Sequence, residues 1–117
     1  MPDLTSDQIA TLRGRYSDLV NYESDDPTQP IDPLTYRDSG GDSLLHIAAA
    51  RGDRDAVLLL LDAGMDPDLT GDMGCTPLHE AAGNGHREVA EMLISRGART
   101  DSVNEFGEAP DLSAFQA

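Results

Sequence analysis

Apolar residues recur along this chain at the three- and four-residue spacing that places side chains on one face of a helix. Two consecutive stripes lie in the second half of the chain: Leu78, Ala81 and Ala82, then Val89, Met92 and Leu93. This spacing predicts two short helices, each burying one face. Gly85 and Gly97 follow the stripes, where a left-handed glycine can end a helix.

The sequence repeats itself after 33 residues. When residues 38–70 are aligned with residues 71–103, ten positions are identical. They are Gly41/Gly74, Leu45/Leu78, His46/His79, Ala48/Ala81, Ala49/Ala82, Gly52/Gly85, Arg54/Arg87, Leu60/Leu93, Gly64/Gly97 and Asp68/Asp101. A further shift matches only in part, with Gly107, Pro110 and Ala114 as the counterparts. A fixed period of this length predicts a stack of similar structural units.

The second unit carries a specific motif. Residues 76–82 read Thr-Pro-Leu-His-Glu-Ala-Ala, and Gly85-His86 and Gly97-Ala98 follow. This unit resembles the ankyrin repeat, whose signature has the same period and the pattern T-P-L-H-x-A. The first unit departs from the pattern at Leu44, which stands in place of proline.

The resemblance implies an all-α fold, a solenoid of stacked helix-turn-helix units. We expect one repeat at 37–69, a second at 70–102 and a truncated capping repeat at 103–117, which lacks an outer helix. In the last unit, Pro110 to Phe115 is expected to form one short helix, with Leu112 and Phe115 closing the core.

Several residues have structural roles in such a unit. Thr76 can cap the first helix with its hydroxyl, and Pro77 suits the first helical position. In the family, the histidine of the motif ties neighbouring turns together through hydrogen bonds to the backbone. We therefore interpret His46 and His79 as structural, since two histidines without a cysteine or carboxylate at ligand spacing make a poor metal site. The remaining structural positions are His86, Leu78, Gly52, Gly64, Gly85 and Gly97.

The N-terminal segment 1–22 has the pattern of a capping helix. Residues 5–8 read Thr-Ser-Asp-Gln, a capping box, and apolar residues follow at helical spacing. These residues are Ile9, Leu12, Tyr16 and Leu19, with Leu4 placed to pack on Ile9. We expect a helix over about 5–22 that covers the first repeat; the alternative is a free helix that docks into a partner. Residues 23–36 contain three prolines and several acids, which predicts an extended linker, with a short partner-binding motif as the alternative.

The charge is strongly acidic. The formal net charge is −14, from 22 acidic and 8 basic residues, and all eight bases are arginine. This charge disfavours binding to nucleic acid and to anionic membranes, and it attracts basic surfaces. It serves solubility in one interpretation and a basic partner in the other. The absence of lysine favours a bacterial source.

Other features concern the cellular location. Cys75 is the only cysteine, so no intramolecular disulfide can form. The N-terminus has no secretory signal pattern, and the longest apolar run, residues 56–61, is too short to cross a bilayer. We expect a soluble, cytoplasmic protein.

The family binds partners through a concave face made of turn tips and the exposed side of each first helix. Mapping the motif onto this chain gives the candidate partner-binding residues Asp42, Arg51, Asp72, Met73, Cys75, Glu80, Asn84, Glu105, Phe106 and Glu108. The set is acidic and places Met73 and Phe106 at adjacent turn tips. An apolar pair among acids is typical of a recognition patch. In the alternative, the acids reflect the composition of the whole chain and Phe106 folds inward. Cys75 is expected to be exposed but not reactive.

These patterns favour a non-catalytic protein-interaction module that binds through an acidic concave face. The first alternative is an immunity or antitoxin-type inhibitor that blocks a basic active site. The second is a regulatory or structural subunit of a larger complex. No catalytic triad, phosphate loop or metal constellation emerges, so we expect no enzyme activity and no cofactor. The free protein is expected to be a monomer.

Overall fold

The structure is a computed structural model, and it describes residues 4–16, 33–38 and 40–112. Its helices are α1 (Ser6–Arg15), α2 (Leu44–Arg51), α3 (Arg54–Asp62), α4 (Pro77–Gly83) and α5 (Arg87–Ser95). A 3₁₀ turn, η1, covers Asp72–Gly74. The described part of the chain contains no β-strand beyond an isolated bridge between Arg37 and Ser43. The all-α prediction is therefore confirmed.

The first helix of each repeat begins at a hydroxyl residue. Ser43 caps α2 and Thr76 caps α4, and each side chain accepts a hydrogen bond from the backbone N–H three residues later. Pro77 occupies the first turn of α4 as expected. A backbone N–H at that position has no acceptor within the helix, so proline, which has no N–H, loses no hydrogen bond there.

The predicted glycines end or follow the helices. Backbone φ angles are positive at Gly52, Gly64, Gly85 and Gly97, between 71° and 96°. The chain can therefore turn from each first helix into the second, and from each second helix into the next turn.

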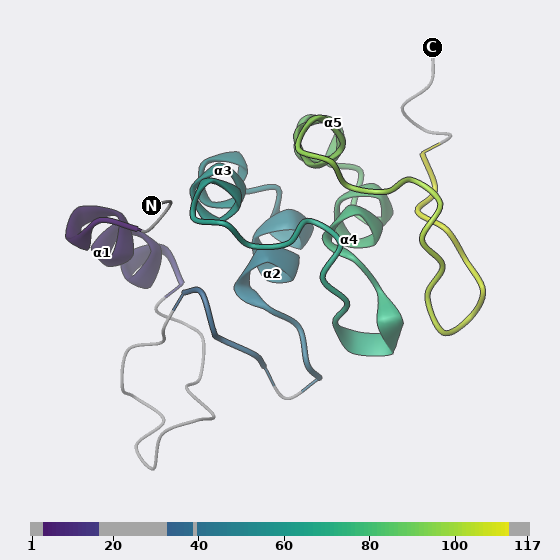
Figure 1. Ribbon diagram of the computed structural model, residues 1–117, viewed down its shortest axis with the longest axis horizontal. Coiled ribbons are helices and arrows are strands. Elements are labelled where there is room, and N and C mark those ends of the chain that lie inside the picture. Colours follow the sequence, from purple (N-terminus) through teal and green to yellow (C-terminus); the bar gives the residue numbers. More distant parts are fainter. Residues whose placement is uncertain (1–3, 17–32, 39, 113–117) are drawn as a thin grey trace.

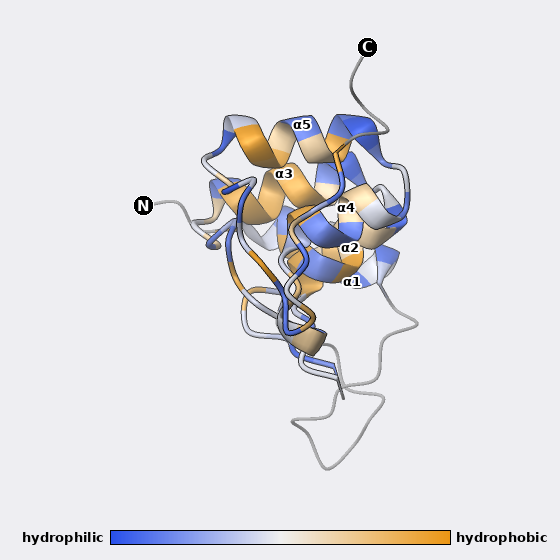
Figure 2. Ribbon diagram, turned by 90° about the vertical axis from the view of Figure 1, so that its right-hand side faces the viewer, coloured by the Kyte–Doolittle hydropathy of each residue, from blue (hydrophilic) through white to orange (hydrophobic). Residues whose placement is uncertain are grey.

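The molecule is built in layers, as Figures 1 and 2 show. The outer layer contains α3 and α5, and the inner layer contains α2 and α4. The turns project from the inner layer, on the side away from α3 and α5. Helix α2 packs on α4 and α3 packs on α5, so equivalent helices of the two repeats lie next to each other.

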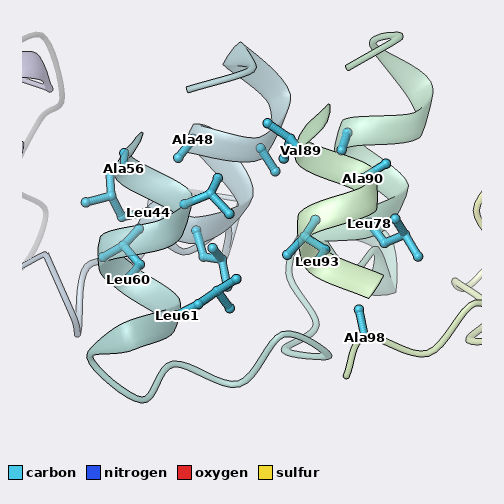
Figure 3. Packing of buried hydrophobic residues seen from close by; sticks show 14 of the residues in the cluster. Leu44, Ala48, Ala56, Leu60, Leu61, Leu78, Val89, Ala90, Leu93 and Ala98 are labelled. Atoms are coloured by element: carbon cyan, nitrogen blue, oxygen red, sulfur yellow. The ribbon is translucent and has the colours of Figure 1, made fainter. Parts of the chain in front are cut away.

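The core lies between these helices and is filled by leucine, alanine and valine (Figure 3). Leu44, Leu60, Leu78 and Leu93 are completely buried. Burying a leucine contributes about 2 kcal/mol, so these side chains are a large part of what holds the stack together. Small alanines between them allow the helices of neighbouring repeats to approach closely. The buried alanines are Ala48, Ala49, Ala56, Ala81, Ala82, Ala90 and Ala98.

Helix α1 is shorter than the sequence pattern predicted. It begins with the expected capping box at Thr5 but ends at Arg15, with a C-cap at Tyr16. The predicted residues 17–22, including Leu19, lie outside the described residues. Leu12 and Tyr16 belong to the buried core, and Leu4 packs against it. The tyrosine hydroxyl donates a hydrogen bond to Asp53 Oδ2 (2.8 Å).

Asp53 joins α1 to the first repeat. Its carboxylate accepts hydrogen bonds from Tyr16 and Arg15 of α1, and it also caps α3 through the backbone N–H of Ala56. Burial alone would raise the pKa of Asp53, but the hydrogen bonds from Tyr16, Ala56 and Arg15 lower it below its usual value. Burial and the hydrogen bond to Asp53 raise the pKa of Tyr16. One carboxylate thus fixes both α1 and the start of α3.

The described residues after the second repeat differ from the expectation. Pro110 to Leu112 are not helical, and the rest of the predicted helix, with Phe115, lies outside the described residues. Leu112 is partly buried and packs on the core. Of the predicted linker, only residues 33–36 are described, and Pro33 and Tyr36 are buried there.

Candidate partner-binding face

The three turns have the same backbone connection. The N–H of Asp38 donates to the carbonyl of Asp42 (2.9 Å), that of Gly71 to Cys75 (2.8 Å) and that of Asn104 to Glu108 (2.9 Å). Each donor lies 33 residues after the previous one, so the sequence period is also the period of the turns. We call the surface formed by these turns and the exposed residues of α2 and α4 the inner face.

Histidines fix each turn to the next one. His46 Nε2 lies 2.9 Å from the carbonyl oxygen of Cys75, and His79 Nε2 lies 2.8 Å from that of Glu108. A carbonyl oxygen only accepts, so Nε2 carries the proton in both rings and Nδ1 is an acceptor. Nδ1 of His46 then accepts from the hydroxyl and the N–H of Ser43. His46 and His79 thus make hydrogen bonds to the backbone of the next turn, as the resemblance implies.

His46 is held in its neutral form. Its ring is completely buried, and burial lowers its pKa below the usual value. A second proton on Nδ1 would also face the N–H of Ser43, which already donates to that nitrogen. His46 is therefore a fixed connector between the turns rather than a proton-transfer group.

His86 connects the two repeats at the end of α2 that lies opposite the turns. Its Nε2 lies 2.9 Å from the carbonyl oxygen of Ala50, near the end of α2. Its ring also fills the space beside Gly52, where an added Cβ would lie 2.6 Å from Nδ1. His86 therefore contacts the end of the first repeat's inner helix through both a hydrogen bond and its ring.

Carboxylates of both repeats meet on the inner face. Asp42 Oδ1 accepts a hydrogen bond from the backbone N–H of Asp72 (2.8 Å), so the acids of two consecutive turns are neighbours. Glu80, on α4, is partly buried beside them. Burial and the negative charges of Asp42, Asp72 and Asp38 raise the pKa of Glu80. The ionised form of Glu80 is thus disfavoured in the folded protein.

The third turn adds two exposed acids and an aromatic ring. Glu105 and Glu108 are exposed, and Phe106 has 68% of its surface accessible. Met73 in the second turn is 50% exposed. The alternative in which Phe106 folds inward is therefore wrong. Arg37 also lies in the turns, but its guanidinium donates to the carbonyls of Gly41 and Thr70.

The turn, the histidine connector and the stacked helix pairs agree with a comparison to known families. The sequence model described as ankyrin repeats, in three copies, matches residues 9–104 of this chain. The chain belongs to the ankyrin-repeat family. The match begins inside α1, so it includes part of the N-terminal segment. Ankyrin repeats are generally protein-protein interaction modules and are typically not catalytic.

Some predicted binding residues of this ankyrin protein lie elsewhere than on the turn tips. Arg51 is exposed, but its guanidinium carbon lies 5.1 Å from the ring centroid of Tyr16, so it contacts the N-terminal helix. Asn84 is the C-cap of α4, and its side chain donates to the carbonyl of Glu80 (2.8 Å). Both residues are at the ends of the inner helices opposite the turns. The structure therefore separates Arg51 and Asn84 from the rest of the predicted set, which lies in the turns or, for Glu80, on α4 beside the turn acids.

The expectation of an exposed thiol at Cys75 is wrong. The side chain is partly buried, because Asn104 of the next turn covers it, with Nδ2 3.7 Å from Sγ. Burial and the nearby carboxylates of Glu80, Asp42 and Asp72 raise the pKa of the Cys75 thiol. A raised pKa keeps more of this thiol protonated at neutral pH, which disfavours its reactivity.

Two residues that shape the turns were missed at the sequence level. Asp38 Oδ1 accepts from the N–H groups of Gly40 and Asp42, and Asn104 Oδ1 accepts from those of Phe106 and Glu108. Asp and Asn near glycine are typical of such turns, so their position was the available signal. The corresponding residue of the middle turn is Gly71, where an added Cβ would lie 2.3 Å from Asp42 Oδ1. Gly71 therefore makes room for the carboxylate of the preceding turn.

A groove on the outer layer is a second surface feature of this ankyrin stack. It lies between α3 and α5, and Leu58 and Met92 contribute apolar surface to it. Ion pairs connect the two helices beside it: Arg54 with Glu88 (3.6 Å) and Arg96 with Asp62 (2.5 Å). The groove has charges of both signs, whereas the inner face is acidic.

The described residues contain neither of two other kinds of feature. Among them, no group of three or more histidine, cysteine, aspartate or glutamate side chains is arranged to hold a metal ion. Within the same ranges, no helix is both long and apolar enough to cross a membrane.

Proposed function

We propose that this ankyrin protein binds a partner protein with a basic surface through its acidic inner face. The acids concerned are Asp42, Asp72, Glu80, Glu105 and Glu108. The observation that carries the proposal is the position of Glu80, a partly buried carboxylate next to Asp42 and Asp72. Such a group opposes folding when it is ionised, and a cationic partner would remove the repulsion.

The inner face is also rigid in the way that a recognition surface needs. Each turn is tied to the next by a buried or partly buried histidine. The N–H of Asp72 also donates to Asp42 Oδ1 between the first and second turns, and the N–H of Glu105 donates to the carbonyl of Met73 between the second and third. A surface that is already ordered loses little conformational entropy when a partner binds. Binding needs no chemistry at these residues, so we propose a non-catalytic function.

The finer predictions from the sequence rest on the same features. An inhibitor of a toxin or enzyme with a basic active site would use the same acidic face, because a concentrated negative surface complements a cationic cleft. A subunit that completes its stack against a larger protein is the other form of the proposal. A cytoplasmic location, a bacterial source, a monomeric free state and the repeat boundaries at 37–69 and 70–102 stay predictions.

Charge reversal tests the proposal. The test variant changes Asp72, Glu80, Glu105 and Glu108 to lysine. The matched control changes four acids of the outer helices, Asp55, Asp62, Glu88 and Glu91, to lysine, so both proteins gain the same charge. Partners are captured with the full chain, identified, purified and measured by calorimetry.

The expected result is at least about a tenfold loss of affinity for the test variant and a small effect for the control. Thermal melting of both variants verifies that they fold. Equal losses in the two variants would show that only total charge matters. Retained binding in the test variant would place the interface elsewhere, with the groove between α3 and α5 and the N-terminal helix as the next surfaces to change. Gel filtration of the free chain separates a monomer from an obligate subunit.

A further inference from the structure

Two turn tips of the inner face present large apolar side chains to solvent. Gly40, Met73 and Phe106 occupy the same position of the three turns, 33 residues apart. The first is a glycine, whereas the second and third are the half-exposed Met73 and the mostly exposed Phe106. The fold does not need an apolar side chain at this position, because the first turn forms with glycine there.

Met73 also has an unfavourable backbone conformation. Its φ and ψ angles are 57° and 23°, and it is the one non-glycine residue with positive φ among the described residues. Glycine adopts this conformation without steric cost, and a side chain with a Cβ does not. Folding thus strains the backbone at Met73 and buries only part of its side chain in return, so the fold itself gives little reason for a methionine there.

The two tips are fixed next to each other. The N–H of Glu105 donates to the carbonyl oxygen of Met73 (2.9 Å), which joins the second turn to the third. The N–H of Phe106 donates to Asn104 Oδ1 (2.9 Å), which holds the third turn in shape. Figure 1 shows these turns side by side at the edge of the molecule. Met73 and Phe106 are therefore presented as a pair from a preorganised backbone.

The surroundings of the pair determine the chemistry of a partner. Asp72 precedes Met73, Glu105 precedes Phe106, and Glu108 follows in the same turn; all three acids are exposed. Apolar side chains gain most when they enter a dry pocket, and the acids beside them are best matched by cations at the rim of that pocket.

We infer that Met73 and Phe106 are the anchors of the interface and insert into an apolar cavity of the partner protein that is rimmed by lysine or arginine. This inference rests on the proposed function, because it specifies how the acidic inner face makes contact. It differs from a purely electrostatic interface, in which the two apolar tips contribute little.

A synthetic host with this chemistry is a direct probe. Amino-substituted β-cyclodextrin has an apolar cavity with a cationic rim, and unsubstituted and carboxylated β-cyclodextrins have the same cavity with a neutral and an anionic rim. Each host is titrated into the ¹⁵N-labelled full chain. The amino host should bind most tightly and the carboxylated host most weakly, with amide shifts concentrated at residues 72–75 and 104–108. Shifts elsewhere, or equal binding of the three hosts, would overturn the inference.

Single substitutions distinguish the anchors from other apolar surface. Phe106→Ser and Met73→Gly should each weaken binding of the amino host about fivefold or more. Met73→Gly should do so without lowering the melting temperature, because glycine suits the backbone at this position. Val103→Ser is the matched control, since Val103 is also highly exposed but is not at a turn tip. An equal loss in the Val103 variant would contradict the anchor role.

The same variants separate this inference from the proposed function when a partner is in hand. If Met73→Gly and Phe106→Ser each lower the affinity for the partner about tenfold, the inference is supported. If charge reversal of the inner face abolishes binding and the tip variants have no effect, the inference fails and the proposed function stands. If neither set of variants changes the affinity, both fail.

Discussion

Equivalent residues of the two repeats can have different neighbours. Gly52 and Gly85 end the first helix region of their repeats with φ angles of 71° and 75°. An added Cβ at Gly52 would lie 2.6 to 2.9 Å from three atoms of the His86 ring, whereas one at Gly85 would have no neighbouring atom within 4 Å. The sequence predicted the glycines from the helix period, but it could not predict this contact, because it depends on how the repeats stack.

Gly52→Ala should therefore cost more than Gly85→Ala. Each substitution places a Cβ in the left-handed region, at about 1 kcal/mol. Gly52→Ala also displaces a ring that hydrogen-bonds to Ala50, so we expect a total loss above about 2 kcal/mol in the free energy of unfolding. Urea denaturation measures both values. In a His86→Ala background the two substitutions should become equally costly, and a persistent difference would point to another cause.

Burial of His46 predicts how stability changes with pH. The pKa of His46 is lower in the folded protein than in the unfolded chain, where it is about 6.5. As the pH falls through this value, the unfolded chain takes up a proton and the folded protein does not, so the stability due to neutral His46 is lost. It is fully present above about pH 6.5.

The comparison of the wild type with His46→Ala isolates this effect, because other groups titrate in both proteins. At pH 8 the wild type should be the more stable one by a clear margin, since the variant loses a buried hydrogen-bonded side chain. The margin should shrink steadily between pH 7 and pH 5. Urea midpoints at each pH give the values, and a margin that does not change with pH would contradict the assigned protonation state.

At the scale of elements, the helices of the repeats were predictable and the flanking segments were predictable only in part. Periodicity, capping residues and glycines define α2 to α5 locally, so sequence rules locate them well. Helix α1 was predicted to continue past Arg15 because the apolar spacing extends to Leu19. The described helix ends at Arg15, and the hydroxyl of its C-cap residue, Tyr16, donates to Asp53, a residue 37 positions away. A contact of that range leaves no trace in the local pattern.

The candidate site was also predictable only where local sequence determines it. The acids and the apolar tips of the turns follow from the register of the repeat, and the structure places them on one face. The cover of Cys75 by Asn104 and the contact of Arg51 with Tyr16 join different elements, so neither could be anticipated from spacing.

Asp53 is the residue on which the attachment of α1 depends. Asp53→Ala should lower the free energy of unfolding by about 2 kcal/mol, since it removes the N-cap of α3 and the partner of the Tyr16 hydroxyl. Hydrogen exchange of the α1 amides should also become faster than that of α4. The control is Asp55→Ala, which removes the same charge from an exposed side chain in the first turn of α3 and should cost less than about 0.5 kcal/mol. Similar losses in the two variants would show that the charge, not the contact, matters.

At the scale of the whole molecule, the stacking of the repeats concentrates a charge that is spread along the sequence. Asp38 and Asp42 come from the first repeat and Asp72 and Glu80 from the second, yet all four interact electrostatically. The outer helices have a different arrangement, in which Arg54 and Arg96 pair with acids of the neighbouring repeat. Acids and arginines therefore pair on the outer helices, whereas acids repel one another on the inner face. This is expected if the residues of the inner face are selected for binding rather than for stability.

This repulsion can be measured through Glu80. Its pKa is raised in the folded protein, so the ionised side chain costs stability at neutral pH, and the cost disappears as the pH falls towards the unfolded value near 4.5. Glu80→Gln should therefore increase the free energy of unfolding at pH 7 by about 0.5 kcal/mol, a modest gain because solvent screens a half-exposed carboxylate. The gain should shrink towards pH 4.5 and also at high NaCl, which screens Asp42 and Asp72.

Glu88→Gln on α5 is the control and should give no gain, since Glu88 pairs with Arg54. If Glu80→Gln is more stable but binds the partner less well, the acid is retained for binding; if it is destabilised at pH 7, the inner face does not carry the repulsion that we assign to it.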